Sequence, residues 1–227
     1  MERMPEPIEN YAMIGDCRSA ALVGRSGSID WLCLPRFDSS SMFARILGDE
    51  SHGHWTLHPV GAEQCAERRY DDDTFTLISR WVTDTGEVDV IDLMPHGDGE
   101  ANVVRRVVGV SGSVTIEQEL RIRFDYADSM PWVRQVGTDD EPALIAIAGP
   151  DAIIVRGVGF TAIDHAHRAE FTVNAGDTVD TTLTWFPSHK QPRAPQPVDT
   201  LIDETREWWH TWARRSSSAR WASSTSP

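Results

Sequence analysis

The chain has 227 residues, of which 40% are hydrophobic, and its formal net charge at neutral pH is −14. This length suits one large domain or one domain plus a piece of another, and the composition allows a substantial core. The negative charge argues against nucleic acids and anionic membrane surfaces as partners, because both are polyanions.

Short segments with the alternation or composition of β-strands recur along most of the chain. They lie at residues 20–25, 28–34, 53–60, 74–82, 87–95, 102–110, 113–126, 143–149, 152–158, 169–174 and 178–186. Turn signals separate them, including Ser26-Gly27, Asp84-Thr85-Gly86 and Asn174-Ala175-Gly176-Asp177, and the glycine-containing residues 109–113 are expected to form a hairpin as well. The absence of a βαβ alternation argues against a parallel sheet. The sequence therefore predicts an all-β fold, with one large antiparallel β-sandwich over residues 1–188.

The strand at residues 113–126 shows the clearest period of two. Its apolar side chains point one way, and these are Val114, Ile116, Leu120, Ile122 and Phe124. Its polar side chains point the other way, and these are Thr115, Glu117, Glu119, Arg121 and Arg123. We expect the first set to be buried and the second set to face water.

The pattern changes after Pro187. Residues 189–198 are rich in proline and predict a linker. Residues 199–215 predict a linker helix. One face of this helix carries Leu201, Thr205, Trp208 and Trp212, and Ile202 and Trp209 widen that face. Residues 216–227 have no periodicity and are expected to be a disordered tail.

Several carboxylate pairs and histidine groups have spacings that are compatible with a catalytic or a metal site. Glu87 with Asp89, and Glu117 with Glu119, lie two residues apart on strands, so each pair shares a face and could in principle cleave a glycoside. A solvated strand face explains such pairs better. The histidine groups, His52, His54 and His58 on one strand and His165 and His167 on another, lack further ligands that would complete a metal site. We predict no catalytic residue, no metal and no cofactor.

The stretch from Gly27 to Ala44, GSIDWLCLPRFDSSSMFA, is the most informative part of the chain. Pro35 cannot donate within a sheet, so the strand is expected to end there, and a short helix over residues 40–48 is expected to follow. The stretch can be a structural corner, in which Arg36 pairs with Asp38. It can also be a substrate-binding corner, in which Arg36 and Asp38 bond sugar hydroxyls while Phe37 or Trp31 stacks on the ring.

Long segments of the chain resemble one enzyme family. The segment IGDCRSAALVGRSGSIDWLCLPRFDSSSMFARIL, residues 14–47, is similar to the N-terminal hallmark of bacterial trehalase-like and glucoamylase-like proteins of glycoside hydrolase family 15. Looser similarity continues through RRYDDDTFTLISRW, VDVIDLMP, VVRRVVGVSGSVTIEQELRIRFDYA and EWWHTWARR, so that it covers roughly residues 7–215. The chain departs from the pattern at Ser40, at Leu93 and in the tail.

The resemblance implies an architecture and an activity. Such proteins consist of an antiparallel β-sandwich, a linker helix and an (α/α)6 barrel, and the barrel supplies two glutamates that hydrolyse an α-glucoside by inversion. The chain ends where that barrel would begin, so we expect an accessory domain without the catalytic machinery, truncated before the barrel and inactive alone. The resemblance also implies that Trp208, Trp209 and Trp212 form an interface with the barrel.

Two partners follow from this interpretation. One is the missing barrel or a homologous chain, and the other is an α-glucoside such as trehalose or a maltooligosaccharide. The alternative is a free-standing β-sandwich that binds carbohydrate or another protein through exposed tryptophans. Cys17, Cys33 and Cys65 form no Cys-x-x-Cys motif, and no segment has the length of a signal peptide or a membrane helix, so we expect a cytoplasmic protein.

Overall fold

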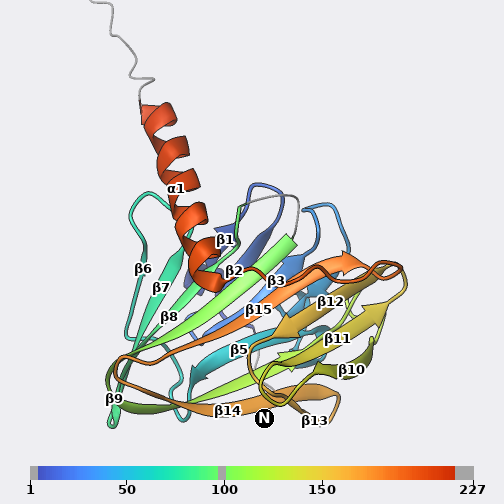
Figure 1. Ribbon diagram of the computed structural model, residues 1–227, viewed down its shortest axis with the longest axis horizontal. Coiled ribbons are helices and arrows are strands. Elements are labelled where there is room, and N and C mark those ends of the chain that lie inside the picture. The colour runs from blue at the N-terminus through green and yellow to red at the C-terminus, as the bar shows by residue number, and fades with distance from the viewer. Residues whose placement is uncertain (1–4, 97–100, 218–227) are drawn as a thin grey trace, which may run out of the picture.

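The computed structural model describes residues 5–96 and 101–217. The described residues form fifteen strands in antiparallel pairing and one C-terminal α-helix, so the predicted fold class is confirmed (Figure 1). The strands make two layers that meet across one strand, β9 (Ala101–Arg121). No helix among these residues is both long and apolar enough to cross a bilayer.

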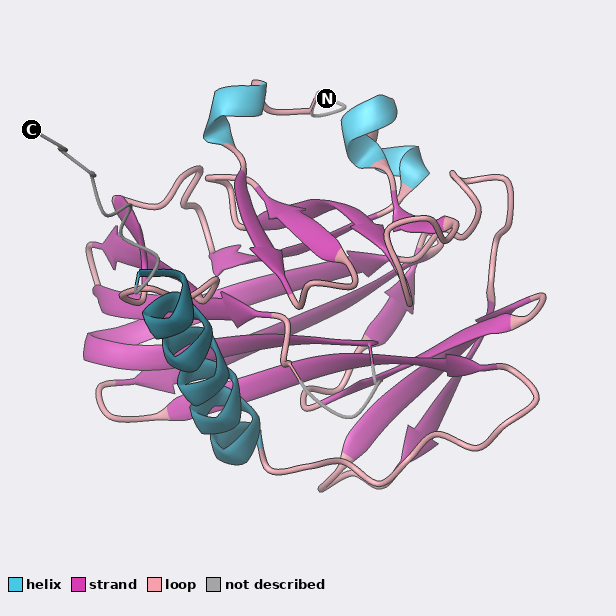
Figure 2. Cartoon of the chain, turned by 90° about the horizontal axis from the view of Figure 1, so that it is seen from above, coloured by secondary structure: helices cyan, strands magenta, loops and turns pink. Residues whose placement is uncertain are grey.

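The first sheet contains seven strands besides the C-terminal half of β9. They are β1 (Ala12–Gly15), β2 (Ala20–Val23), β3 (Ser28–Cys33), β4 (Ser41–Phe43), β5 (His54–Pro59), β13 (Thr161–Ile163) and β14 (Ala166–Asn174). Three short 3-10 helices lie on the outer side of this sheet, away from the second sheet (Figure 2), and they are η1 (Ile8–Asn10), η2 (Arg45–Leu47) and η3 (Glu50–His52).

The second sheet contains seven strands besides the N-terminal half of β9. They are β6 (Glu67–Tyr70), β7 (Leu77–Thr83), β8 (Gly86–Leu93), β10 (Trp132–Gly137), β11 (Pro142–Ala148), β12 (Asp151–Arg156) and β15 (Thr178–Pro187). The sequence missed β10, because its side chains are largely exposed and do not alternate.

The long strand β9 joins the layers. Its first half lies between β8 and β15, and its second half lies between β5 and β14. The expected hairpin at residues 109–113 was wrong, since the strand continues through these glycines with a shift of register against β8. Gly109 allows this: a Cβ there would lie 1.9 Å from the carbonyl oxygen of Asn174, at the start of the β14–β15 turn.

The core fills the space between the layers. The alternation predicted for 113–126 places Val114, Ile116 and Leu120 inside, where they are fully buried. Arg105 is also fully buried, and it joins the layers through polar contacts. Its Nε donates to Asp92 Oδ1 (2.8 Å), and its two Nη groups donate to the carbonyls of Trp55 and Gly27 (2.7 Å each).

The helix predicted at residues 40–48 was wrong. Met42 and Phe43 lie in β4, which pairs with β3, and only Arg45–Leu47 is helical, as the 3-10 turn η2. Both apolar side chains are fully buried although they point to opposite faces of the strand, so both faces of β4 are covered. Tertiary burial thus overrides the local capping signal.

The C-terminal helix α1 (Val198–Ser217) crosses the outer face of the second sheet and projects beyond the edge of the sandwich (Figure 1). Its buried residues are Ile202, Thr205 and Trp209. All three belong to the predicted face, but its centre lies on the Ile202 and Trp209 side, because Trp208 is only partly buried and Trp212 is exposed. The preceding residues, 188–197, have no regular structure. Residues 218–227, most of the predicted tail, lie outside the described residues.

Candidate functional site

The predicted corner lies directly after β3. The Leu34–Pro35 peptide bond is cis, and the chain then turns tightly, with the Ser39 N–H donating to the carbonyl of Arg36 (3.1 Å). The Phe37 N–H donates to the carbonyl of Arg18 (2.9 Å), which fixes the corner to the β1–β2 turn. The corner is thus held by backbone bonds, and its side chains are left to point outward.

Arg36 and Asp38 form a two-pronged ion pair. Arg36 Nε donates to Asp38 Oδ1 (2.9 Å) and Nη2 donates to Oδ2 (2.8 Å). Both side chains are more than two-thirds exposed, at 68% and 69%, so the pair adds little to stability. Phe37 between them is 61% exposed. The structure therefore contains the pair that a structural corner requires, and it also presents all three groups to solvent.

The β1–β2 turn lies beside this corner. Asp16 is buried, and its Oδ1 accepts from the N–H groups of Arg18 (2.8 Å) and Ser19 (2.7 Å). Cys17 has a φ of +69°, in the left-handed region that a tight turn uses. The Ser19 hydroxyl donates to the carbonyl of Cys33, which ties this turn to the end of β3.

Trp31 is half-buried, and its ring packs against Tyr126 with centroids 6.1 Å apart. The turn that carries Tyr126 is itself fixed to the start of β4, because the Tyr126 N–H donates to the Ser41 hydroxyl (3.0 Å). The Ser40 hydroxyl donates to Asp125 in that turn (3.0 Å). Three turns, at residues 15–19, 34–40 and 125–129, are therefore linked by hydrogen bonds.

The helix α1 completes this end of the molecule. The Trp208 ring stacks on His96 with centroids 3.5 Å apart. Burial lowers the pKa of His96; the charge of Asp16 raises this pKa and the charge of Arg18 lowers it. We call the three turns together with His96 and Trp208 the rim.

The other two tryptophans of the predicted interface differ in exposure. Trp209 is only 4% exposed, because its ring packs on Phe75 with centroids 4.8 Å apart. Trp212 is 50% exposed and contacts Trp209 edge-on. Trp209 therefore anchors α1 to its own sandwich, whereas half of the Trp212 side chain is exposed.

The rim offers binding groups rather than a pair of catalytic acids. Asp16 is buried and accepts two backbone bonds, and Asp38 is paired with Arg36. Guanidinium donors, a carboxylate acceptor and exposed aromatic faces suit a ligand that is rich in hydroxyl groups.

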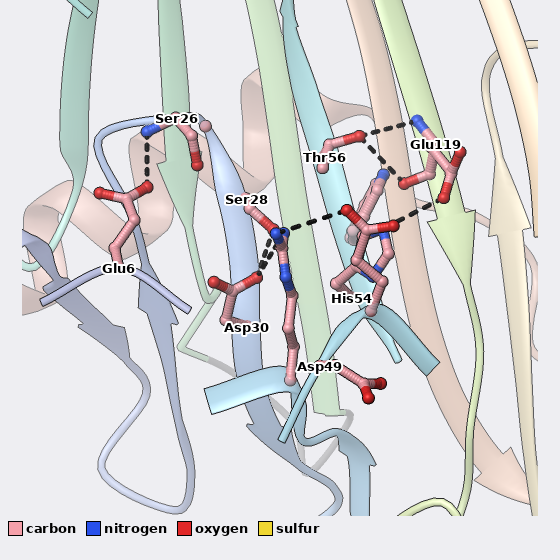
Figure 3. Close-up of polar contacts among 12 residues, drawn as sticks. Glu6, Ser26, Ser28, Asp30, Asp49, His54, Thr56 and Glu119 are labelled. Carbon is pink, nitrogen blue, oxygen red and sulfur yellow. Dashed lines mark hydrogen bonds and ion pairs between the residues drawn. The ribbon is translucent and has the colours of Figure 1, made fainter. Parts of the chain in front are cut away.

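The other carboxylates that the sequence singled out have structural partners. Glu119 on β9 accepts from His54 Nε2 (3.2 Å) and from Arg168 Nε (2.6 Å), and the His54 bond is the main reason why its pKa falls from 4.5 to about 2 (Figure 3). Arg80 pairs with both Glu87 and Asp89. In the described ranges no group of three or more His, Cys, Asp or Glu side chains is arranged to hold a metal ion.

Asp30, in the middle of the GSIDWLC segment, is buried and structural, a role that the sequence did not reveal. Its Oδ2 accepts from the Tyr11 hydroxyl (2.6 Å), its Oδ1 accepts from Ser28, and Arg45 lies 3.5 Å away (Figure 3). Burial, followed by the bond to Asp30, raises the pKa of Tyr11. This network fixes the N-terminal segment to the first sheet, where Glu6 also accepts from the N–H of Ser26 (2.9 Å).

The fold and the rim define a class of protein: an antiparallel β-sandwich domain with a projecting C-terminal helix. A family model described as "Trehalase-like, N-terminal" matches residues 2–194, and the chain belongs to this family.

Curated relatives agree with this assignment. The chain is 29% identical to a trehalase of Mycolicibacterium smegmatis and 30% identical to a trehalase of Mycobacterium tuberculosis, and each match covers 91% of this chain and 34% of the relative. A trehalase of Thermoplasma volcanium is 25% identical over 93% of this chain and 34% of its own length. The chain thus spans about a third of the length of these relatives.

Proposed function

We propose that this chain acts as the accessory N-terminal domain of an α-glucoside hydrolase of glycoside hydrolase family 15, and that catalysis belongs to an (α/α)6 barrel beyond it. The observation that carries the proposal is the match to a trehalase-like N-terminal model over residues 2–194, by a chain that spans 34% of its relatives. The remaining two-thirds of such a protein would hold the two carboxylates of an inverting mechanism.

The rim is the surface that would face this barrel. It carries the exposed Arg36, Phe37 and Asp38, and it includes Tyr126, whose ring packs against Trp31. We assign these four residues to the sugar site, with Arg36 and Asp38 bonding hydroxyls and the aromatic rings covering the apolar C–H face of a sugar. The relatives are named trehalases, so trehalose is the first substrate to test and maltooligosaccharides are the second.

The helix would provide the contact between the two parts. Trp209 fixes α1 to the sandwich, while Trp208 and the half-exposed Trp212 present aromatic surface at the end where α1 leaves it. Aromatic residues of this kind are typical of the central contacts of an interface. A barrel that follows α1, in the same chain or as a homologous chain, would cover them.

Two experiments test the proposal. First, the purified chain is expected not to hydrolyse trehalose, maltose or a glucan, and turnover that disappears when one of its own carboxylates is replaced would contradict the proposal. Second, the domain is joined to the barrel of a relative, and Arg36→Ala and Asp38→Ala are compared with Arg134→Ala on β10 as a control.

The expected outcome separates binding from stability. Loss of a charged hydrogen bond to substrate lowers kcat/KM by about ten- to a hundredfold, while the melting temperature stays constant. The Arg134 variant should leave both quantities unchanged. If the corner variants lose stability in step with activity, the corner is structural and the assignment of its side chains to the sugar site is wrong.

The second candidate function is a free-standing module that binds carbohydrate or a protein. Trp132 on β10 is 65% exposed and is not one of the rim residues, which favours a second contact surface. Affinity electrophoresis of the chain in gels with soluble glucans tests this function. Retardation that Trp132→Ala abolishes would favour the module, and migration independent of glucan would favour the accessory role.

We also propose a cytoplasmic location. Cys17, Cys33 and Cys65 are free thiols, as is typical of reducing compartments. Fractionation of cells that express the full-length protein tests this location, and recovery in the secreted fraction would contradict it.

A further inference from the structure

The side chain of Arg123 does not lie where the sequence pattern places it. The alternation of residues 113–126 predicts that it faces water with Glu117, Glu119 and Arg121, and this was wrong. The strand β9 ends at Arg121, and the Arg123 N–H then donates to the carbonyl of Met42 (3.2 Å) in β4. The chain turns here, and Arg123 is only 7% exposed.

This buried guanidinium has no carboxylate partner among the described residues. Its Nη1 donates to the carbonyl of Ile122 (2.7 Å) and to that of His165 (3.4 Å), and these are its hydrogen bonds in the described part of the chain. Burial, followed by the charge of Arg121, lowers the pKa of Arg123. A buried cation without a counter-ion is unfavourable, so the site calls for an anion from outside these residues.

Arg123 lines a cavity of about 270 Å³ at the end of the sandwich. The other walls are mainly apolar and come from the segment before β10, from β10 and from the β13–β14 hairpin, and they include Met130, Pro131, Val133 and Ile163. His167 also lines the cavity, and burial together with the charge of Arg123 lowers the pKa of this ring.

The hairpin turn at the mouth of the cavity is held in place by two arginines. Asp164 and His165 have φ values of +48° and +60°, as a two-residue hairpin turn requires. The carbonyl of His165 accepts from Arg123, and the carbonyl of Asp164 accepts from Arg121 (3.3 Å). The Asp164 side chain is exposed at the mouth and makes no ion pair with Arg123 within the described residues.

We propose that this cavity binds a small oxyanion, the carboxylate or phosphate group of a small molecule, on the Nε and Nη2 groups of Arg123. Only Nη1 is used by the protein's own carbonyls, which leaves the edge of the guanidinium that pairs with two oxygens at once. The apolar walls fit a ligand with a short hydrocarbon part beside its charged group. The cavity adjoins the rim turn at residues 125–129, but none of its lining residues belongs to the rim, and the proposal does not depend on the function proposed for the rim.

The experiment is titration calorimetry on the full chain at constant ionic strength, with sodium acetate, sodium butyrate and inorganic phosphate as probes and acetamide as the neutral control. Saturable binding of at least one oxyanion and none of acetamide is expected. A preference for acetate and butyrate identifies a carboxylate ligand, and a preference for phosphate identifies a phosphorylated one.

Three variants test the assignment. Arg123→Gln should weaken binding by about ten- to a hundredfold, because it removes charged hydrogen bonds. Ala162→Phe should block the cavity from its exposed edge while Arg123 is kept. Asp164→Asn should tighten binding, because it removes a negative charge from the mouth. Circular dichroism and the melting temperature check that each variant folds, and if Arg123→Gln does not fold, the other two variants decide.

Two outcomes would overturn the proposal. One is the absence of saturable binding by every oxyanion probe, which would leave an acidic side chain of another protein as the occupant. The other is binding that neither Arg123→Gln nor Ala162→Phe changes, which would place the anion elsewhere on the chain.

Discussion

The buried ion pair between Arg105 and Asp92 allows a sharp test of how the two sheets are held together. Asp92→Asn keeps the size of the side chain and one acceptor oxygen, so it creates no cavity. It removes the negative charge that faces a fully buried guanidinium, whose other bonds go to the carbonyls of Trp55 and Gly27. The variant therefore isolates the electrostatic part of the contact.

Asp92→Asn is expected to lower the free energy of unfolding by a large amount for the replacement of a single heavy atom. Removing one partner of a buried pair costs about 3–5 kcal/mol, since the remaining charge is left without compensation. For a protein of this size each kcal/mol moves the melting temperature by about 2–4 °C, so a fall of at least about 6 °C is expected. The retained bonds of Arg105 to two carbonyls favour the lower end of this range.

The same strand provides the control. Asp89 also lies on β8 and also pairs with an arginine, but its partner Arg80 is 36% exposed, and such pairs contribute about 0–1 kcal/mol. Urea unfolding of Asp92→Asn and Asp89→Asn, followed by tryptophan fluorescence, gives both free energies of unfolding. Equal losses below about 1 kcal/mol in the two variants would refute the reasoning from burial.

Further predictions concern single side chains. Folding lowers the pKa of Glu119 from 4.5 to about 2, so its carboxylate stabilises the fold above pH 4.5, and this stabilisation is lost as the pH falls from 4.5 to about 2. Glu119→Gln should therefore flatten the pH dependence of the free energy of unfolding over this range, measured by urea unfolding. Gly109→Ala should cost about 1–3 kcal/mol by overpacking, whereas Gly159→Ala, where a Cβ meets nothing closer than 3.8 Å, should leave the melting temperature nearly unchanged. Trp209→Ala should cost about 3–5 kcal/mol and Trp212→Ala less than about 0.5 kcal/mol, and equal costs in thermal unfolding would contradict the orientation of α1.

Local patterns predicted much of the fold because most strands carry their own signal. The turns at residues 26–27, 84–86 and 174–177 lie where glycine and polar residues indicated them, and the apolar set that begins at Val114 is buried. The predictions were wrong where contacts with segments distant in the sequence determine the local structure. Residues 109–113 carry a hairpin composition, yet packing of the β14–β15 turn on Gly109 keeps the strand extended.

The site was predictable only in part, for a similar reason. The corner at residues 35–38 was found because its residue types are unusual at the end of a strand. The burial of Arg123 was not predicted, because an alternating pattern does not show where β9 ends. The end of β9 depends on the contact of Arg123 with β4. Trp209 and Trp212 differ by less than one turn of a helix, so the sequence could not show which of them faces the sandwich.

The position of β9 in both layers has a consequence for how the protein folds and how it responds to proteolytic cleavage. Its pairing partners run from His54 in β5 to Trp185 in β15, so neither sheet can close before segments far apart in sequence have met. High average sequence separation of contacts slows folding, and one shared strand couples the two layers into a single cooperative unit. A cut within residues 109–113 would therefore release both sheets together, and neither half of the chain is expected to persist as a folded fragment.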